Sequence, residues 1–239
     1  MGRPFLPKGS AVSTSFCHLI GAGSFYPPFF APREGDLVIA CDGGLAHLSS
    51  LGYTPHLAVG DFDSFTGKPE ELLPSERILR LPREKDDTDC LYALKWGLSR
   101  GYTRFLLHGS LGGERFSHAV ANLALLDYLN GAGGQGVLLG KGIAAFLLED
   151  GKLTFPNHTE GYFSVFSLEK EGELTLEGFK YPFTGKLQRA MPLGVSNEFL
   201  KDVSASVTAK DGSFLLIAEG VNDPLLFFEA ETKEELYER

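Results

Sequence analysis

The order of strand-like and helix-like segments is the feature that most constrains the fold of this chain. Up to about residue 145, short apolar runs such as Leu37–Cys41 alternate with stretches in which leucine recurs at helical spacing, as at Leu91, Leu94 and Leu98. This alternation is typical of a mostly parallel sheet with helices on both faces, so we predict a three-layer α/β domain. Strands are expected at residues 17–20, 37–41, 57–59, 77–81, 105–108 and 137–139, and helices ending at 51, running from 88 to the stop at Gly101, and at 117–130.

The pattern changes after about residue 145. Short runs with alternating polar and apolar residues follow one another, with Gly, Pro and Asp-Gly turns between them. The clearest runs are at 162–167, 174–177, 205–208 and 214–218. Because this pattern is typical of an antiparallel β-sandwich, we predict two domains. The α/β domain is expected over residues 1–142 and the smaller antiparallel β-sandwich domain over residues 143–239, with the glycine-rich segment 131–142 as connector.

Composition and charge exclude several classes of protein. The chain has 239 residues, of which 43% are hydrophobic, so it can bury a sizeable core, and its formal net charge of −9 disfavours a nucleic-acid binder. Cys17, Cys41 and Cys90 are too widely spaced for a zinc ribbon or a disulfide scaffold and fit a reducing compartment. No apolar run approaches the length of about 18 residues that a transmembrane helix needs, and the N-terminus lacks the apolar core of a signal peptide. We therefore expect a cytoplasmic protein without nucleic-acid or membrane partners.

Acidic residues follow three successive predicted strands. They are Asp42, then Asp61 and Asp63, then Asp86, Asp87 and Asp89. In an open α/β sheet, ligands bind just outside the carboxyl ends of the strands, so we expect these carboxylates to meet at one edge. The pair Asp61 and Asp63 offers the oxygen ligands that Mg²⁺ takes together with substrate phosphates. A solvated turn is the alternative, because Gly-Asp-x-Asp-Ser is also favourable turn chemistry.

Two further segments carry groups that suit phosphate. Lys85 stands beside the third acidic group, directly before a helix whose first turn Asp87 or Thr88 can cap. The glycine-rich segment 109–115 leads from a strand into a helix and ends in Arg115, so its backbone N–H groups are suited to binding phosphates. It matches neither the P-loop nor the dinucleotide-binding fingerprint. A capped helix and an ordinary glycine turn are therefore the alternatives.

Taken in order, these motifs resemble those of the thiamine pyrophosphokinase family, and the resemblance covers about residues 15–220. Its motifs are Asp42-Gly43-Gly44, Gly60-Asp61-Phe62-Asp63-Ser64, Lys85-Asp86-Asp87-Thr88-Asp89, the segment 112–122, Gly178-Phe179-Lys180-Tyr181-Pro182 and Gly194-Val195-Ser196-Asn197-Glu198-Phe199. The resemblance implies an enzyme that transfers the terminal pyrophosphoryl group of ATP to the hydroxyethyl group of thiamine, giving thiamine diphosphate and AMP with Mg²⁺. It also implies a homodimer with shared active sites.

The resemblance further implies a role for ten residues. Those that would hold the metal are Asp61, Asp63 and Asp89, with Asp86 close by. Those that would lie along the phosphates of ATP are Lys85, Thr88 and Arg115. Those that would lie near thiamine are Asp42, Ser196 and Asn197, the last two reaching the site across the dimer interface. The residues expected to act directly in catalysis are Asp61, Asp63, Asp89, Lys85 and Arg115.

One position departs from the family pattern. Ser117 stands where the family has an aspartate, in the stretch Gly113-Glu114-Arg115-Phe116-Ser117-His118. Two alternatives therefore stay open, a related pyrophosphokinase acting on another heterocyclic alcohol such as a pterin, and a non-catalytic sensor of thiamine or nucleotide. The Ser196-Asn197 motif argues against the first, because the β domain is the thiamine-linked part of the family. A turnover assay separates the three.

Overall fold

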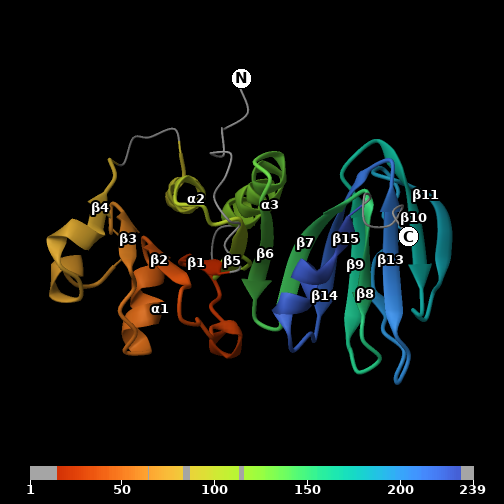
Figure 1. Ribbon diagram of the computed structural model, residues 1–239, viewed down its shortest axis with the longest axis horizontal. Coiled ribbons are helices and arrows are strands. Elements are labelled where there is room, and N and C mark those ends of the chain that lie inside the picture. Colours follow the sequence, from red (N-terminus) through yellow and green to blue (C-terminus); the bar gives the residue numbers. More distant parts are fainter. Residues whose placement is uncertain (1–14, 64, 83–86, 113–115, 233–239) are drawn as a thin grey trace. The chain divides into compact units, whose positions relative to one another are not determined.

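A computed structural model of the protein describes residues 15–63, 65–82, 87–112 and 116–232 (Figure 1). The chain divides into two compact units, Met1–Lys141 and Gly142–Arg239, here called the α/β unit and the β unit. A parallel sheet with helices makes up the first, and antiparallel strands make up the second. The predicted fold class, a mostly parallel α/β domain followed by an antiparallel β-sandwich domain, is therefore confirmed.

A parallel sheet forms the centre of the α/β unit. Its strands, in spatial order, are β6 (Gln135–Gly140), β5 (Arg104–His108), β1 (Phe16–Ile20), β2 (Leu37–Cys41), β3 (Leu57–Gly60) and β4 (Ile78–Arg80). Each neighbouring pair is parallel. The chain runs outward from β1 to β4 and then returns to the other side of β1 as β5, so the strand order reverses between β1 and β5. Such a reversal point opens a crevice at the carboxyl ends of the strands, where ligands bind in open α/β sheets.

Helices cover the two faces of this sheet (Figure 1). Helix α1 (Gly44–Ser50) lies on one face, and α2 (Asp89–Ser99) and α3 (Phe116–Gly131) lie on the opposite face. Gly97 lets α2 pack closely on the sheet, because a Cβ atom there would come within 2.9 Å of the Phe105 ring. Short 3-10 turns η2 (Pro69–Glu71) and η3 (Ser75–Arg77) precede β4. None of the helices in the described part of the chain has both the length and the hydropathy to cross a membrane.

An aromatic segment takes the place of a helix after β1. It contains the 3-10 turn η1 (Pro27–Phe29), and it lies on the same side of the sheet as α1 (Figure 1). Phe25 and Phe30 pack against the hydrophobic cluster between α1 and the sheet. The segment therefore covers part of this face of the sheet, where Ile20 of β1 and Val38 of β2 belong to the cluster.

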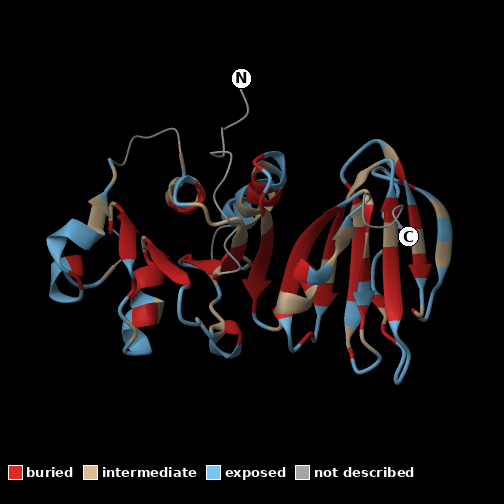
Figure 2. Ribbon diagram, viewed as in Figure 1, coloured by how far each residue is buried: buried red, intermediate tan, exposed pale blue. Residues whose placement is uncertain are grey.

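The β unit is a sandwich of two antiparallel sheets. One contains β12 (Asn197–Glu198), β9 (Tyr162–Ser167), β14 (Ser213–Glu219) and β7 (Ile143–Glu149). The other contains β11 (Phe183–Gln188), β10 (Glu171–Glu177), β13 (Ala205–Lys210), β8 (Gly151–Phe155) and β15 (Glu231–Thr232), and the 3-10 helix η4 (Pro224–Glu229) precedes β15. Phe155 and Phe163, from facing sheets, meet with ring centroids 5.7 Å apart in a core of phenylalanines. Figure 2 shows the buried residues along these strands.

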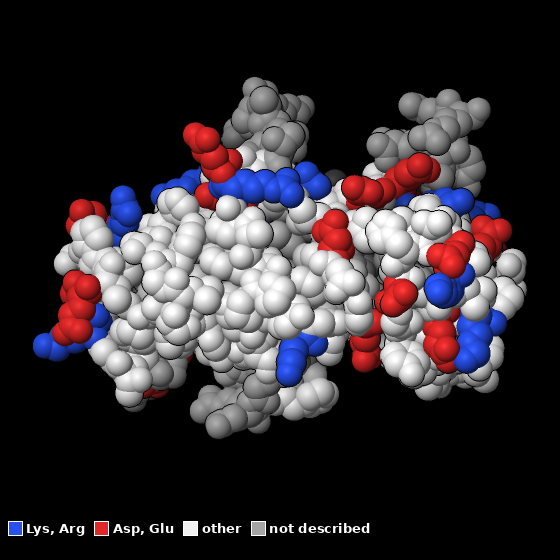
Figure 3. Space-filling model, turned by 90° about the horizontal axis from the view of Figure 1, so that it is seen from below, with Lys and Arg blue, Asp and Glu red and all other residues white. Residues whose placement is uncertain are grey.

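Charged side chains lie mostly on the surface. On the face drawn in Figure 3, they gather at the margins of the α/β unit, and the middle of that unit's face is uncharged. In the β unit, ion pairs such as Lys186 with Glu171 (2.6 Å) and Lys180 with Glu198 (2.7 Å) join neighbouring strands and turns. Because these pairs are exposed, each contributes little to stability.

Candidate active site

Three carboxylates come together at the carboxyl edge of the parallel sheet. Asp42 follows β2, and Asp61 and Asp63 follow the neighbouring strand β3. One carboxylate oxygen of each lies within 4.8 Å of those of the other two. The backbone N–H of Asp42 donates to the carbonyl of Val59 at 2.8 Å, which fixes the end of β2 against β3. The expectation that successive strands deliver carboxylates to one edge therefore holds for these three residues.

The backbone around this cluster is bent into conformations that are rare for side chains other than glycine. Asp42 has φ of 48° and Phe62 has φ of 59°. Each such residue costs about 1 kcal/mol or more, and strain of this kind is concentrated at functional sites. Gly60 allows the close approach of the two loops, because a Cβ atom there would lie 3.0 Å from the Cα of Asp42. The turns after β2 and β3 can therefore lie close together, with Asp42 on one and Asp61 on the other.

A buried phenylalanine orients the Asp61-x-Asp63 pair. Phe62 is buried in the hydrophobic cluster under α1, together with Leu45 and Leu48. The N–H of Asp63 donates to Oδ1 of Asp61 at 3.2 Å, which closes the turn. The burial of the Phe62 ring between the two carboxylates explains why this motif has an aromatic residue at its centre. A turn that only faced solvent would need no buried residue at its centre.

The donor set of the cluster fits a hard divalent cation. Three carboxylate oxygens at this spacing are the ligand type that Mg²⁺ takes, and the ion completes its coordination with water and phosphate oxygens. Asp42, which the resemblance assigns to thiamine, lies in the cluster, whereas Asp89 does not belong to it. Asp89 is the first residue of α2, and its charge acts on Cys41 at the end of β2. The pKa of the Cys41 thiol is raised by a hydrogen bond with Cys90 and by burial, and the charge of Asp89 adds to this.

The start of α2 is capped by Thr88. The hydroxyl oxygen of Thr88 accepts the N–H of Leu91 at 3.1 Å, so the side chain is the N-cap that the sequence allowed for. Sequence reasoning missed Lys95, whose ammonium group donates to both oxygens of Asp87 at 2.7 and 2.8 Å. That hydrogen bond raises the pKa of Lys95. Asp87 precedes the helix and Lys95 lies eight residues further along the chain, so no local pattern signals this pair.

Several predicted residues lie outside the described part of the chain. They are Ser64, Lys85, Asp86, Glu114 and Arg115. Ser117 is described, and it is exposed in the first turn of α3.

Two glycine turns, which follow β1 and β5, contact each other at the carboxyl edge of the parallel sheet. The N–H of Gly21 donates to the carbonyl of His108 at 2.8 Å, and that of Gly23 donates to the carbonyl of Gly109 at 2.9 Å. Gly109 has φ of 59°, and a Cβ atom on Gly23 would come to 2.5 Å from its carbonyl oxygen. The two turns can approach only because both lack side chains. They lie at the reversal point of the strand order, where an open α/β sheet binds its ligand.

In the β unit, Ser196 and Asn197 differ in what they can contact. Ser196 is exposed and has φ of 57°. Asn197 is 5% exposed, and its amide is engaged with the backbone of its own unit. Its oxygen accepts the N–H groups of Tyr181 (3.0 Å) and Glu198 (2.9 Å), and its nitrogen donates to the carbonyl of Tyr181 (2.8 Å). Asn197 therefore holds the Tyr181 segment in place, and a direct contact with thiamine stays a prediction for both Ser196 and Asn197.

Comparisons with known proteins agree with this division into two units. The family model described as thiamin pyrophosphokinase, catalytic domain, matches residues 33–132. The model described as thiamin pyrophosphokinase, vitamin B1 binding domain, matches residues 152–214. A thiamine pyrophosphokinase of Bacillus subtilis (strain 168) is 30% identical over 181 residues, which cover 70% of this chain and 80% of that protein.

Solved structures show the same fold. A crystal structure of thiamine pyrophosphokinase from Bacillus subtilis has a TM-score of 0.76 at 26% identity, covering 86% of this chain and 99% of that chain. A crystal structure of thiamin pyrophosphokinase from Geobacillus thermodenitrificans has a TM-score of 0.74 at 27% identity, covering 85% and 97%. The yeast thiamin pyrophosphokinase, at 16% identity and a TM-score of 0.69, covers 90% of this chain and 89% of that one and shares the fold.

Proposed function

Because the chain belongs to the thiamin pyrophosphokinase family, we propose that it transfers the terminal pyrophosphoryl group of ATP to the hydroxyethyl group of thiamine, releasing AMP. The observation that carries this proposal is the approach of Asp42, Asp61 and Asp63 at the carboxyl edge of the sheet. Transfer of this kind depends mainly on positioning and on neutralising phosphate charge. A carboxylate cluster that would hold Mg²⁺, beside two glycine turns, supports both requirements.

The residues of the chain divide the work as follows in this proposal. Asp61 and Asp63 hold Mg²⁺ together with Asp42 or Asp89, and the bound ion neutralises charge on the transferred phosphates. Lys85 and Arg115 contribute positive charge along the phosphates from segments outside the described residues. Thr88, at the start of α2, keeps its hydroxyl hydrogen for a phosphate oxygen. Asp86 is expected close to the metal.

The experiment that tests the reaction is an incubation of the protein with thiamine, ATP and Mg²⁺. Thiamine diphosphate is expected to form, and AMP is expected as the product nucleotide. EDTA should stop the reaction and excess Mg²⁺ should restore it. Formation of thiamine monophosphate with ADP would refute the proposal.

Two other functions are distinguished by the same assay. A pyrophosphokinase for another heterocyclic alcohol would turn over a hydroxymethyl pterin and not thiamine. A sensor would bind thiamine or nucleotide without turnover, and Ser117 is the feature that favours it. The vitamin B1 binding model over residues 152–214 favours thiamine over a pterin.

We further propose that the protein is a homodimer in which Ser196 completes the site of the partner subunit. Exposed apolar side chains beside Ser196 support an interface there. Tyr181, Leu193 and Val195 line one pocket of the β unit, and they are 60%, 68% and 47% exposed. Exposed apolar residues that lie together in this way are typical of surfaces that bind another protein.

Complementation between two defective variants tests the shared site. In this arrangement, Asp63→Asn inactivates the site of its own subunit, and Ser196→Arg blocks the site of the neighbouring subunit. A heterodimer of the two variants keeps one intact site, so co-expression should restore activity that neither variant shows alone. An active monomer by light scattering, or no recovery in a purified heterodimer, would contradict the shared site.

A further inference from the structure

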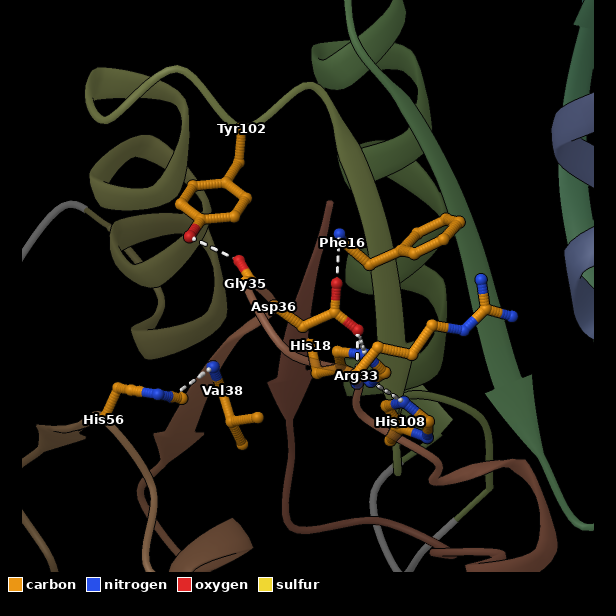
Figure 4. Close-up of polar contacts among 9 residues, drawn as sticks. All are labelled: Phe16, His18, Arg33, Gly35, Asp36, Val38, His56, Tyr102 and His108. Carbon is orange, nitrogen blue, oxygen red and sulfur yellow. Dashed lines mark hydrogen bonds and ion pairs between the residues drawn. The ribbon is translucent and has the colours of Figure 1, made fainter. Parts of the chain in front are cut away.

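Three buried polar side chains, those of Asp36, His18 and His108, form a chain of contacts within the α/β unit (Figure 4). Nε2 of His18 lies 3.3 Å from Oδ2 of Asp36, and Nδ1 of His18 lies 3.1 Å from Nε2 of His108. The three residues are 2%, 7% and 1% exposed. They come from β1, from the residue that precedes β2, and from the last residue of β5. Polar groups buried to this degree are costly unless each has a defined partner.

The surroundings of Asp36 fix which nitrogen of each imidazole carries its hydrogen. The carboxylate accepts the backbone N–H groups of Phe16 (2.7 Å) and Arg33 (2.8 Å), so it acts as an acceptor throughout. His18 must therefore donate to it from Nε2, which leaves Nδ1 of His18 as an acceptor. His108 then donates to that nitrogen from its own Nε2. Both histidines are assigned by this reasoning as neutral Nε2–H tautomers.

Burial keeps the pair neutral. It lowers the pKa of His108 well below the usual value of 6.5, and the neighbouring His18 lowers it further. Burial also lowers the pKa of His18, although the hydrogen bond to Asp36 opposes this. Phe25 and Phe30 pack against His108 with ring centroids 5.9 and 5.6 Å away. The charge of Arg33 also lowers the pKa of His18. The titratable groups near Asp36 are Cys17, Tyr53 and Tyr102, and the charge of Asp36 contributes to raising the pKa of each of them.

His108 is the link between this chain and the glycine turns. Its carbonyl accepts the N–H of Gly21, and the next carbonyl, that of Gly109, accepts the N–H of Gly23. The turn after β5 is held at two more points. The hydroxyl of Ser110 donates to the carbonyl of Leu107 at 2.6 Å, and the side-chain amide of Asn122 donates to the carbonyl of Ser110 at 2.8 Å. The position of the His108 backbone therefore sets the position of both turns.

We propose that Asp36, His18 and His108 are positioning residues that hold the two glycine turns, Gly21–Gly23 and Gly109–Gly112, in the arrangement that receives the phosphates of the nucleotide. This inference rests on the proposed function, because it takes the nucleotide to bind at the reversal point of the sheet. The three residues do not touch the ligand. Their role is to fix the end of β5 through one hydrogen-bonded chain.

Matched substitutions at His108 test this role. His108→Leu keeps the side-chain volume and removes the N–H that His18 accepts, and we expect it to raise the KM for ATP about tenfold with little change in the KM for thiamine. His108→Gln keeps an N–H near the position of Nε2, and we expect a KM for ATP within about threefold of the wild type. His56→Leu is the control, because Nδ1 of His56 accepts the N–H of Val38 away from the glycine turns. Its KM for ATP should be that of the wild type.

The tautomers give a readout that needs no variant. An imidazole ¹⁵N spectrum at pH 7.5 should show His18 and His108 as neutral rings with the hydrogen on Nε2, and this measurement decides the matter if His108→Leu does not fold. A wild-type Nδ1–H tautomer at His108 would overturn the inference. A folded His108→Leu protein with an unchanged KM for ATP, or a His108→Gln protein as impaired as His108→Leu, would overturn it too.

The proposed function and this inference fail in different ways. If the wild type forms no thiamine diphosphate, the proposed reaction is wrong. The dissociation constant of an ATP analogue with Mg²⁺ then replaces the KM in ranking the same three variants. If the wild type is active and the ranking is absent, the reaction stands and the positioning role is wrong.

Discussion

Removing the side-chain amide of Asn197 should destabilise the β unit through lost backbone hydrogen bonds. The amide makes three such bonds, two to Tyr181 and one to Glu198, at 2.8 to 3.0 Å. A buried bond of this kind contributes about 1 kcal/mol net, so Asn197→Ala should lower the free energy of unfolding by about 3 kcal/mol. In a unit of about 100 residues, that corresponds to a fall in Tm of about 12 °C or more.

Urea unfolding followed by two signals measures this effect. Far-ultraviolet circular dichroism reports both units, whereas the fluorescence of Trp96, the single tryptophan, reports the α/β unit. Asn197→Ala should shift the circular dichroism transition to lower urea. Ser196→Ala is the matched control, because this neighbouring hydroxyl is exposed, and its free energy of unfolding should stay within about 0.5 kcal/mol of the wild type.

Comparing the two variants also separates a residue that holds the Tyr181 segment from a residue that binds thiamine. We expect Ser196→Ala to raise the KM for thiamine while the protein keeps its stability. If Asn197→Ala unfolded within 1 kcal/mol of the wild type and still lost thiamine binding, the amide would have to contact the ligand directly, and the reasoning from its three backbone bonds would be refuted. That threshold is about a third of the loss worked out from those bonds.

Three other perturbations have defined outcomes. Mg²⁺ should raise the Tm of the wild type by mass action and leave that of Asp63→Asn unchanged, with turnover of the variant lower by several orders of magnitude; an Mg²⁺ shift retained by the variant would show that Asp63 is no ligand. The free energy of unfolding should fall as the pH drops below about 6.5, because His108 is protonated in the unfolded chain but stays neutral in the folded protein, where burial lowers its pKa. The slope approaches about 1.4 kcal/mol per pH unit for this one proton, and His108→Gln should reduce the slope. Ser117→Asp should change kcat/KM by less than about tenfold, because Asp61 and Asp63 carry the metal site without it; an inactive wild type that this substitution activates would place the protein among sensors.

The elements that the sequence predicts correctly are those with a strong local pattern. The apolar run 37–41 is β2, and the leucine spacing after Thr88 is α2 with Thr88 as its cap. The sequence does not predict the strand β7 (Ile143–Glu149). Because this strand is buried on both faces, it shows no alternation of polar and apolar residues. The strand expected at 137–139 is β6, which begins at Gln135 inside the glycine-rich segment 131–142 that we expected as the connector between the domains. A glycine-rich composition does not prevent a strand where neighbours cover the backbone, as Leu129 covers Gly136.

In the candidate site too, features set by adjacent residues can be predicted from the sequence, whereas contacts between distant residues cannot. The turn at Asp61 and Asp63 is specified by adjacent residues, so its motif is visible in the sequence. The approach of Asp42 to that pair depends on the register of β2 against β3, which a motif does not state. The chain through His18 and His108 joins positions 90 residues apart. A histidine at the end of a strand, directly before a glycine turn, is the one sequence signal that marks it.

The proposed reaction predicts where two phosphorus atoms go. With ATP labelled at both the β and the γ phosphorus, and with thiamine and Mg²⁺ present, both labels should enter thiamine diphosphate, with one unlabelled AMP released for each molecule formed. Quantifying the labelled products by chromatography measures this directly. Labelled ADP formed in step with a singly labelled thiamine ester would contradict pyrophosphoryl transfer, and label that stays in ATP while thiamine is bound would contradict catalysis.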